Sequence, residues 1–508
     1  MTGETPLRLQ SNRTDPERIN VDIFIVGAGP AGLLCAFLAR LCGLSVFIAD
    51  RSSGPLRVGR ADALNARSLQ LLEIGGLFSE LYPFGKTCNT SSVWANGNFV
   101  SRQSTWWEDL EGCFHKHFLM LGQAFVEQLL DRKLSELQAS VRRKTLVNGV
   151  NATENGCVST LSSGEVIESR FVIGADGSHS FVRQLFNIPF EITRPQLTWA
   201  VLDGVIESDF PKVPEIIVFQ TETSDVAWIP RERDIDRFYI RMDTDTFSMN
   251  DAIAKINRAM HPHSLNFKEI EWFSQFSVKE SVAANFSLDD RIFLVGDACH
   301  IHSVNGGMGL NTGLSDAFNL IWKIHQVIRF QSPTMLLRTY EQERKPVALR
   351  VVETSGALVR TTKQSETGMH ATDYVKLVEK RAGNITGMGI RYGEQDLDGS
   401  RLFDFMVSCG EGQALGLPSQ TRVYSLLDYR FFTLLIFSDL KIAVEPPDFV
   451  RLIQISPSRE SGDRWADNCP YHEQILLVRP DSYIAASSPI NDISSITDYM
   501  DSLRPKAV

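Results

Sequence analysis

The 508-residue chain contains no long apolar run and no closely spaced cysteine pair. A membrane-spanning helix needs about 18 consecutive apolar residues, and no segment reaches that length. No two cysteines have Cys-x-x-Cys spacing, which supports neither a zinc site nor a disulfide framework. We therefore expect no membrane contact, and free thiols throughout. The eight cysteines are Cys35, Cys42, Cys88, Cys113, Cys157, Cys299, Cys409 and Cys469.

An excess of positive charge is also lacking. The net charge is −10, from 51 lysines and arginines against 61 acidic residues. Nucleic-acid-binding domains usually present a basic face, so no nucleic-acid partner is expected. Residues 1–20 are polar, without the basic-then-apolar pattern of a signal peptide, and we interpret them as a flexible tail. The last residues match no common retention or peroxisomal signal, so a cytoplasmic location is expected.

What the chain does contain is a βαβ pattern near its start. An apolar strand at residues 21–26 is followed by Gly27-Ala28-Gly29-Pro30-Ala31-Gly32, an Ala-rich helix at 33–42 and a second strand at 45–49. In a G-x-G-x-x-G turn the first glycine makes the tight turn. The second lets the backbone approach a pyrophosphate, and the third lets helix and strand pack closely. Asp50, at the tip of the second strand, can accept ribose hydroxyls. The pattern predicts dinucleotide binding; the alternative is a loop made only for packing.

Two later motifs also follow predicted strands. Asp176-Gly177-Ser178-His179-Ser180 with Arg183 comes after a strand at 171–174, and Gly296-Asp297 comes after a strand at 292–295. A glycine loop, residues 305–309, and a helix from Leu310 follow the second of them. Asp297 is placed to hold a ribityl chain. Backbone donors at the helix N-terminus would stabilise an anionic reduced flavin, so the three motifs together favour FAD over NAD.

The remaining pattern predicts the rest of the fold. Residues 197–276 are rich in β-branched and aromatic residues and should form a sheet over a pocket. Helices are expected from Leu310 and at 340–352, and a glycine-rich linker at 383–399. The predicted class is α/β (α+β overall). A Rossmann-like FAD-binding domain (21–190 and 285–395) carries an inserted substrate sheet (191–284). A C-terminal α/β unit (400–508) has strands at 432–437 and 474–478.

Taken together, these motifs resemble the class A flavoprotein monooxygenases, the aromatic hydroxylases of the p-hydroxybenzoate hydroxylase fold, over nearly the whole chain. Phenol hydroxylase and its fungal relatives are the most similar branch, which implies secondary metabolism. Those proteins carry a C-terminal thioredoxin-like domain, so residues 400–508 are expected to be one. It lacks Cys-x-x-Cys, which favours a packing or dimer-support role. Relatives are often dimers, so a homodimer is one expectation.

The resemblance also assigns a cofactor site. In the family the first motif holds ADP, the D-G motif serves both FAD and NADPH, and the G-D motif holds the ribityl chain. Arg60 and Gln123 match FAD contacts. The predicted cofactor residues are Gly27, Gly29, Ala31, Gly32, Asp50, Arg51, Arg60, Gln123, Asp176, Asp297, Gly307, Gly309, Leu310 and Asn311. No second nucleotide fingerprint is present, so NADPH (or NADH) is expected to bind transiently.

The same branch suggests catalytic residues: Asp62, Arg237 and Tyr239. Arg237 and Tyr239 alternate on one strand face, as the lining of a pocket requires. Asp62 can instead be the N-cap of a helix at 64–72, and Tyr239 a core aromatic. Val304 and Trp228 are predicted to line the substrate pocket. Val304 stands where relatives have a proline, which loosens the loop.

The expected reaction follows from the resemblance. NAD(P)H reduces FAD, oxygen adds to give a flavin C4a-hydroperoxide, and one oxygen atom enters an aromatic substrate. A free phenol has a pKa near 10, so a base or cation is needed to form phenolate. Baeyer–Villiger oxidation, epoxidation and oxidative dearomatisation stay open. A flavin halogenase would need a second tryptophan before Trp228-Ile229-Pro230. A non-catalytic binder such as a Rab GDP-dissociation inhibitor would need no intact flavin motifs. His300 and His302 lack further ligands nearby, so no metal is expected.

Overall fold

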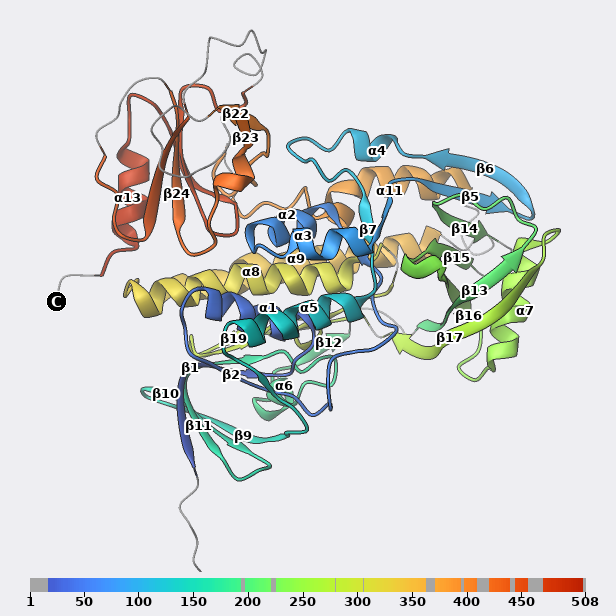
Figure 1. Cartoon of the computed structure of the whole chain (residues 1–508), viewed down its shortest axis with the longest axis horizontal. Helices are drawn as coiled ribbons and strands as arrows, with labels where there is room; N and C mark the ends of the chain where they lie inside the picture. The colour runs from blue at the N-terminus through green and yellow to red at the C-terminus, as the bar shows by residue number, and fades with distance from the viewer. Residues whose placement is uncertain are drawn as a thin grey trace, which may run out of the picture.

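An eight-stranded sheet forms the base of the molecule (Figure 1). Its main path is β19-β20-β11-β1-β2-β8, in which β20, β11, β1, β2 and β8 are parallel. β10 and β9 extend it as antiparallel strands beside β11. The bounds are β1 (Arg18–Val26), β2 (Val46–Ala49), β8 (Val141–Arg142), β9 (Val147–Thr153), β10 (Gly156–Leu161), β11 (Val166–Gly174), β19 (Ser287–Leu288) and β20 (Ile292–Leu294). The computed structural model describes residues 17–192, 197–220, 225–278, 280–304, 306–361, 371–393, 397–408, 420–438, 444–455 and 469–505.

A layer of helices covers this sheet, with α1 packed between α5 and α8 (Figure 1). α8 is almost entirely buried, and its buried polar side chains, such as Asn311, Asp316 and Lys323, have hydrogen-bond partners, as buried polar groups usually do. It lies between α1 and the layer formed by α9 and α2. The helices of this part are α1 (Pro30–Leu41), α2 (Ala66–Ile74), α3 (Phe78–Leu81), α4 (Thr105–Glu108), α5 (Gln123–Glu136), α6 (Phe181–Leu185), α8 (Met308–Arg329), α9 (Met335–Thr361) and α11 (Ala371–Thr386).

A second, seven-stranded sheet has the order β17-β13-β16-β15-β14-β5-β6. One face packs on α7, which starts at a capping box formed by Ser248 and Asp251; the other face looks toward the first domain. The predicted sheet at 197–276 is present, but β5 and β6 join it from outside that range. The elements are β5 (Ser91–Ala95), β6 (Asn98–Gln103), β13 (Leu197–Ser208), β14 (Ile216–Gln220), β15 (Asp225–Pro230), β16 (Asp236–Met242), α7 (Met249–Met260) and β17 (Leu265–Val278).

Two three-stranded sheets connect these parts: β3 (Ala63–Leu64), β7 (Phe118–Met120) and β4 (Lys86–Cys88), and β12 (Phe190–Ile192), β18 (Ser281–Ala283) and β21 (His300–Ile301). The first holds the segment before α2 against the chain that enters α5. The second holds the segment between Asp297 and α8. Both therefore fix loops that carry predicted site residues.

The C-terminal unit is a four-stranded sheet, β25-β24-β26-β27, in which β24 and β25 are parallel and the other pairs antiparallel. The strands predicted at 432–437 and 474–478 are β24 and β26. The unit packs on α8: Tyr429 accepts a hydrogen bond from the Trp322 amide and donates to the Phe318 carbonyl. A thioredoxin-like fold stays a prediction. The elements are β22 (Met406–Ser408), β23 (Gln420–Arg422), β24 (Phe432–Phe437), β25 (Val450–Ile455), β26 (Gln474–Val478), β27 (Ile484–Pro489) and α13 (Ser494–Ser502).

Two predicted irregular segments are partly regular. β1 begins at Arg18, inside the predicted tail, because residues 18–21 pair with β11; residues 1–16 lie outside the described part. The predicted glycine linker at 383–399 starts inside α11, which ends at Thr386. Gly383 is there for close packing, since a Cβ at this position would lie 3.2 Å from the Gly389 Cα.

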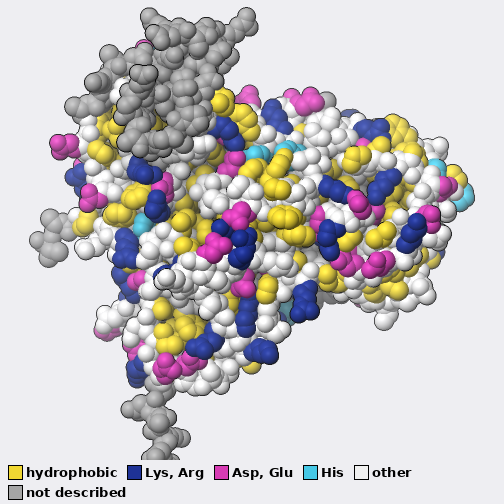
Figure 2. All heavy atoms as spheres, in the orientation of Figure 1, with side chains coloured by type: hydrophobic (Ala, Val, Ile, Leu, Met, Phe, Trp, Pro, Cys, Tyr) yellow, Lys and Arg dark blue, Asp and Glu magenta, His cyan; other side chains and the backbone are white. Residues whose placement is uncertain are grey.

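The cysteines agree with expectation where they are described. Seven cysteines are free, and Cys409 lies outside the described residues. No helix within the described ranges is long and apolar enough to cross a membrane. Figure 2 shows basic and acidic side chains interspersed over the described part of one face.

Candidate active site

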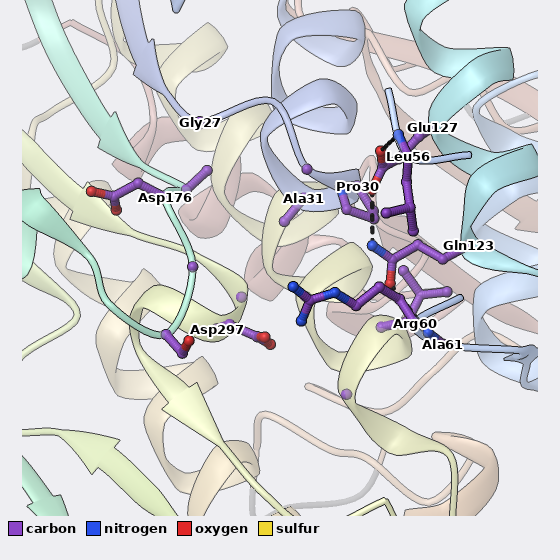
Figure 3. Close-up of a pocket in the computed structure, with 18 of the residues that line it drawn as sticks. Gly27, Pro30, Ala31, Leu56, Arg60, Ala61, Gln123, Glu127, Asp176 and Asp297 are labelled. Carbon is purple, nitrogen blue, oxygen red and sulfur yellow. Dashed lines mark hydrogen bonds between the residues drawn. The ribbon is translucent and has the colours of Figure 1, made fainter. Parts of the chain in front are cut away.

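A continuous cavity of about 1650 Å³ joins the carboxyl ends of β1, β2, β11 and β20 to the inner face of the second sheet. Figure 3 shows Gly27, Asp176 and Asp297 on one side of it and Arg60 and Gln123 on the other. Pockets for one ligand are typically about 300–1,000 Å³. The cavity therefore has room for a long cofactor together with a second molecule.

The first glycine motif is built as its sequence predicts. Gly27 has φ +102°, and a Cβ there or at Gly32 would overlap a backbone carbonyl, that of Ala175 or of Gly27. At Gly29 a Cβ would meet nothing within 4 Å, because this glycine faces the cavity. Gly32 does not line the cavity; it serves the packing of α1 on β1. The open backbone at Gly29 is a place where a pyrophosphate can approach.

Asp50 lines the cavity at the end of β2. Its Oδ2 accepts a hydrogen bond from the Ala28 amide at 2.6 Å, and its Oδ1 accepts from the Ser52 amide at 2.6 Å. Arg51 lines the cavity beside it. The carboxylate therefore braces the glycine turn and stands where a ribose would lie.

The second and third motifs lie next to each other on one side of the cavity (Figure 3). Arg183 donates to the Ser178 and Ala298 carbonyls, both at 2.8 Å, and so ties the two loops together. Asp176 accepts from the Val182 amide through Oδ2, while its buried Oδ1 has no hydrogen-bond partner among the described residues. Burial raises the pKa of Asp176. A buried oxygen without a partner costs free energy, which suits a site completed by a ligand hydroxyl.

On the opposite wall, Arg60 reaches across the cavity toward Asp297 (Figure 3). Burial among protein groups raises the pKa of Asp297, although His300 and Arg60 oppose this. Gln123 is the first residue of α5, as predicted, and donates to Glu127 Oε1 at 2.8 Å. Glu127, which sequence reasoning missed, also accepts from the Leu56 amide at 2.7 Å. These donors and acceptors along an elongated cavity fit FAD.

The N-terminus of α8 forms another part of the wall. Gly307, at φ +60°, precedes the helix, and Gly307, Gly309 and Leu310 line the cavity. Asn311 does not: its amide donates to the Ala63 and Gly307 carbonyls and accepts from the Asn65 amide. Those bonds turn the Asn311 side chain toward the segment before α2, and a cofactor contact at Asn311 stays a prediction.

The loop before α8 also reaches the cavity. Val304 lines it, and its carbonyl accepts from the Gly307 amide at 3.1 Å; Asn305 lies outside the described residues. His302 lines the cavity too, and its Nδ1 donates to the Ser303 carbonyl at 2.8 Å. Burial lowers the pKa of His302 to about 4, so the ring is neutral at pH 7 and Nε2 is an acceptor.

His300 belongs to a different group. Its Nε2 lies 2.8 Å from Asp316 Oδ2, and Arg344 Nε donates to Asp316 Oδ1 at 2.7 Å. The ligand atoms of Cys299, His300 and Asp316 lie within 4.8 Å of one another, a spacing that a metal ion can use. Asp316 also accepts a hydrogen bond from the Gly296 amide. Hydrogen bonds and ion pairs therefore account for this cluster without a metal ion. The absence of a metal stays a prediction.

Two rows of side chains cross the cavity face of the second sheet. The register aligns Trp272, Asp203 and Arg237 in one row, and Ser274, Val201 and Tyr239 in the next. Tyr239 lines the cavity, as predicted for a pocket residue. Arg237 is fully buried beneath the lining. Trp272 also lines the cavity, and sequence reasoning missed it.

The prediction that Trp228 lines the substrate pocket is wrong. Trp228 pairs with Phe238 across the strands, stacks on its ring at 5.4 Å and donates to Asp236 Oδ1 at 2.9 Å. Residues at this parity face α7, whereas Ala227 and Ile229 share the face of Tyr239 and Arg237. The alternation of side chains in a strand places Trp228 in the core of the far face.

Asp62 is not the N-cap of α2. Asn65 is, since its side chain accepts from the Ser68 amide at 3.0 Å. Asp62 lines the cavity, 4% exposed, with Oδ2 3.5 Å from Arg237 Nη1. Arg237 Nη1 also donates to the Tyr239 hydroxyl oxygen at 3.1 Å. Burial raises the pKa of Asp62 against the effect of Arg237. The structure thus brings the three predicted catalytic residues together.

Comparison with known proteins identifies the family. The sequence profile described as "FAD binding domain" matches residues 20–355. The chain belongs to this FAD-binding family. The matched range includes all three motifs and the whole second sheet, so the prediction of FAD binding is confirmed at the level of the family.

Two similar curated proteins are named as monooxygenases. "FAD-dependent monooxygenase ankC" of Aspergillus thermomutatus is 30% identical over 66% of this chain, which spans 62% of that protein. "Phenol 2-monooxygenase fsqG" of Aspergillus fumigatus is 26% identical over 97% of both chains. OxyS anhydrotetracycline hydroxylase from Streptomyces rimosus superposes with a TM-score of 0.76 at 24% identity, over 96% of this chain and all of that one. The predicted class A fold and the prediction of a flavoprotein monooxygenase are confirmed.

Proposed function

We propose that the protein uses NADPH or NADH and O2 to insert one oxygen atom into a phenolic substrate. One observation carries the proposal: Asp62, Arg237 and Tyr239 stand together at the sheet end of the cavity that carries the dinucleotide-binding motifs. The similarity to a phenol 2-monooxygenase over 97% of both chains supports it.

FAD, when bound, supplies the chemistry that takes electrons from NAD(P)H and activates oxygen. The residues that would hold it line the cavity from the β1–α1 turn to the N-terminus of α8. Positive ends of helices α1 and α8 favour the pyrophosphate and a negatively charged flavin edge. The proposed contacts are Gly27, Gly29, Ala31, Asp50, Arg51, Arg60, Gln123, Asp176, Asp297, Gly307, Gly309 and Leu310.

Asp62 would take the proton of the substrate hydroxyl at its Oδ2. Its raised pKa makes the ionised carboxylate a stronger base than an ordinary aspartate. Arg237 donates into the Tyr239 oxygen, so the Tyr239 O–H proton is left to point into the cavity. That proton can donate to the substrate oxygen, and the buried charge of Arg237 stabilises the phenolate.

The first test is of the cofactor and the reaction class. The purified protein should be yellow, with flavin absorbance, and phenols should stimulate oxidation of NADPH or NADH. With ¹⁸O₂, one labelled atom should appear in the product. A colourless protein that does not take up FAD would overturn the proposal and favour a binding protein. Stimulation by ketones or alkenes but not by phenols would instead favour Baeyer–Villiger oxidation or epoxidation.

The second test is of the base. Asp62→Ala should slow product formation by about 100-fold or more, within the range for loss of a general base, while FAD stays bound. Wild-type turnover in this variant would contradict the assignment.

A further inference from the structure

We propose that Asp203 is a positioning residue for this reaction. It holds the Arg237 guanidinium so that one nitrogen contacts Asp62, Tyr239 and the backbone of Arg60. The segment of Gly59 and Arg60, called the Arg60 loop below, lies on the side of the cavity where FAD is proposed to bind. This inference rests on the proposed function and deepens it. Asp203 carries no sequence motif and does not line the cavity. It acts through what it holds.

The grip on Arg237 is bidentate and fully buried. Asp203 and Arg237 are direct partners across β13 and β16. Arg237 Nε donates to Oδ1 and Nη2 donates to Oδ2, both at 2.6 Å, and neither residue is exposed to solvent. A guanidinium is a rigid planar fork. With two nitrogens fixed on one carboxylate, the direction of the third, Nη1, is therefore also fixed.

Nη1 sits at a junction of three groups. It donates to the Tyr239 hydroxyl at 3.1 Å and to the Arg60 carbonyl, and lies 3.5 Å from Asp62 Oδ2. Two of these groups face the substrate end of the cavity, and the third is the backbone of a proposed FAD contact. A shift of Arg237 would therefore displace the substrate-side residues Asp62 and Tyr239 and the Arg60 backbone at the same time.

The Arg60 loop is seated on the same row of side chains. Gly59 has φ +82°, and a Cβ there would lie 2.5 Å from the Trp272 indole. The Arg237 guanidinium carbon lies 5.2 Å from the centre of that indole ring, within the range of cation–π attraction. The loop, the indole and the guanidinium thus form one packed stack whose position depends on the Asp203 carboxylate.

Asp203 is also linked, through Arg231 and Glu232, to the segment of Gly122 and Gln123, which carries another proposed FAD contact. Its Oδ2 accepts from Arg231 Nη1 at 3.0 Å, and Arg231 Nη2 donates to Glu232 Oε1 at 2.6 Å. Glu232 Oε2 in turn accepts from the Gly122 amide at 3.2 Å, immediately before Gln123. One buried carboxylate therefore links the substrate sheet to both segments that carry proposed FAD contacts.

The balance of buried charges explains why Asp62, of the three buried carboxylates near the Arg237 guanidinium, is the one that exchanges a proton. The buried groups around Asp62 are the cations Arg231 and Arg237, the carboxylates Asp203 and Glu232, and the phenol of Tyr239; Arg60 lies at the cavity surface. Two cations balance Asp203 and Glu232, which leaves Asp62 as the third carboxylate. Asp203 and Glu232 add to the effect of burial that raises the pKa of Asp62. If Asp203 were neutral, the positive charge of Arg237 would stabilise the Asp62 carboxylate more strongly. The pKa of Asp62 would then be lower.

The test compares the holoenzyme with Asp203→Asn and Asp236→Asn. Asp236 is a matched control: it adjoins Arg237 on β16, is equally buried and paired with Lys212, but faces α7. FAD affinity is measured by the quenching of flavin fluorescence on rebinding. We expect Asp203→Asn to weaken binding by about tenfold, the order of one charged hydrogen bond, and Asp236→Asn to change it less than twofold. Equal losses in both variants would reduce Asp203 to a structural role and overturn the inference.

A double variant separates positioning from folding. If Asp203 acts through Arg237, then Asp203→Asn should weaken FAD binding little further when Arg237→Gln is already present. This comparison also holds if Asp203→Asn alone does not fold, because the double variant removes opposite charges together. A further tenfold loss of FAD affinity from Arg237→Gln to the double variant would overturn the inference.

The pH profile is the second readout. In Asp203→Asn the acid limb of phenol-stimulated NADPH oxidation should move to lower pH by about one unit, since a nearby opposite charge lowers the pKa of an aspartate. An unmoved limb contradicts the role in proton exchange. If phenols stimulate no oxidation in the wild type, the proposed function fails, while the FAD measurements still decide whether Asp203 positions Arg237.

Discussion

Two aspartates 141 positions apart show how environment divides the work of identical side chains. Asp203 accepts three hydrogen bonds from two guanidinium groups. Asp62 makes one ion pair, with Arg237 at 3.5 Å, and its Oδ2 has no hydrogen-bond partner within the described part of the chain. A buried carboxylate that is well paired stays ionised, whereas a poorly paired one is destabilised in its charged form. Asp62 is therefore the residue suited to exchange a proton, at a cost in stability.

Asp62→Asn should make the protein more stable while it slows turnover. The folded-state pKa of Asp62 is raised, so the folded protein binds more protons than the unfolded chain above about pH 3.9, and stability falls as pH rises toward the folded pKa. Asparagine removes this loss. A tenfold change in an acid dissociation constant corresponds to about 1.4 kcal/mol. We therefore expect the free energy of unfolding of Asp62→Asn at pH 7 to rise by an amount on the order of 1 kcal/mol.

The measurement is thermal unfolding of both proteins at a series of pH values. The advantage of Asp62→Asn should be small near pH 4, grow with pH and then level off. An advantage that is independent of pH, or a less stable variant at pH 7, would show that Asp62 bears no such cost.

Among the elements, the β1–α1 turn separates glycines needed for folding from a glycine needed for binding. Gly29→Ala should fold normally, because its Cβ would meet no atom within 4 Å, but should weaken FAD binding by tenfold or more, since the methyl group occupies the space where a pyrophosphate approaches. Gly27→Ala should destabilise the apoprotein, because the residue has φ +102° and a Cβ there would overlap the Ala175 carbonyl.

Unfolding of the apoproteins and FAD titration distinguish these outcomes. The melting temperature of Gly29→Ala apoprotein should match the wild type within about 1 °C, a difference smaller than that expected from 1 kcal/mol, while that of Gly27→Ala falls. Normal FAD affinity in Gly29→Ala would mean that the pyrophosphate lies elsewhere.

The same turn shows what a sequence can predict. Each glycine acts within a few residues of its neighbours, so strand, turn and helix could all be inferred locally. Tyr239 and Arg237 were likewise correctly placed on one face, because alternation is local. Trp228 was not, since its face depends on the register between β15 and β16, and a shift of one residue exchanges the two faces of a strand.

Asp203 and Trp272 escaped prediction for a related reason. Neither belongs to a motif, and their roles arise only when β13 and β17 pair with each other and β13 pairs with β16. The direction of the Asn311 side chain likewise depends on what packs beside α8, here the segment before α2. Long-range pairing is the part of the site that local patterns do not contain.

At the scale of the whole molecule, the C-terminal unit supports the helix that forms the cavity wall. Arg479 donates to both oxygens of Glu343 on α9, at 2.8 and 2.9 Å, and Lys323 on α8 donates to the same carboxylate at 2.9 Å. Arg479 and Lys323 overcome the effect of burial and hold the pKa of Glu343 below its usual range. Burial lowers the pKa of Lys323 to about 8. One carboxylate therefore joins the unit to α8, whose N-terminus lines the cavity.

Glu343→Gln should destabilise the protein by about 3–5 kcal/mol, because it leaves the buried Lys323 without its carboxylate partner and Arg479 with Asp481 alone. Glu353→Gln on the same helix is the control: its side chain is 59% exposed and pairs with Arg381, and loss of a surface ion pair costs about 1 kcal/mol or less. Urea unfolding measures the stability of both variants.

The pH dependence gives a second readout. In Glu343→Gln the pKa of Lys323 should fall further below its unfolded value, so the unfolded chain binds more protons and the variant gains stability as pH rises. Its deficit against the wild type should therefore narrow between pH 6 and 8. A deficit no larger than that of Glu353→Gln, or one that ignores pH, would mean that the C-terminal unit is held to α8 by apolar packing alone.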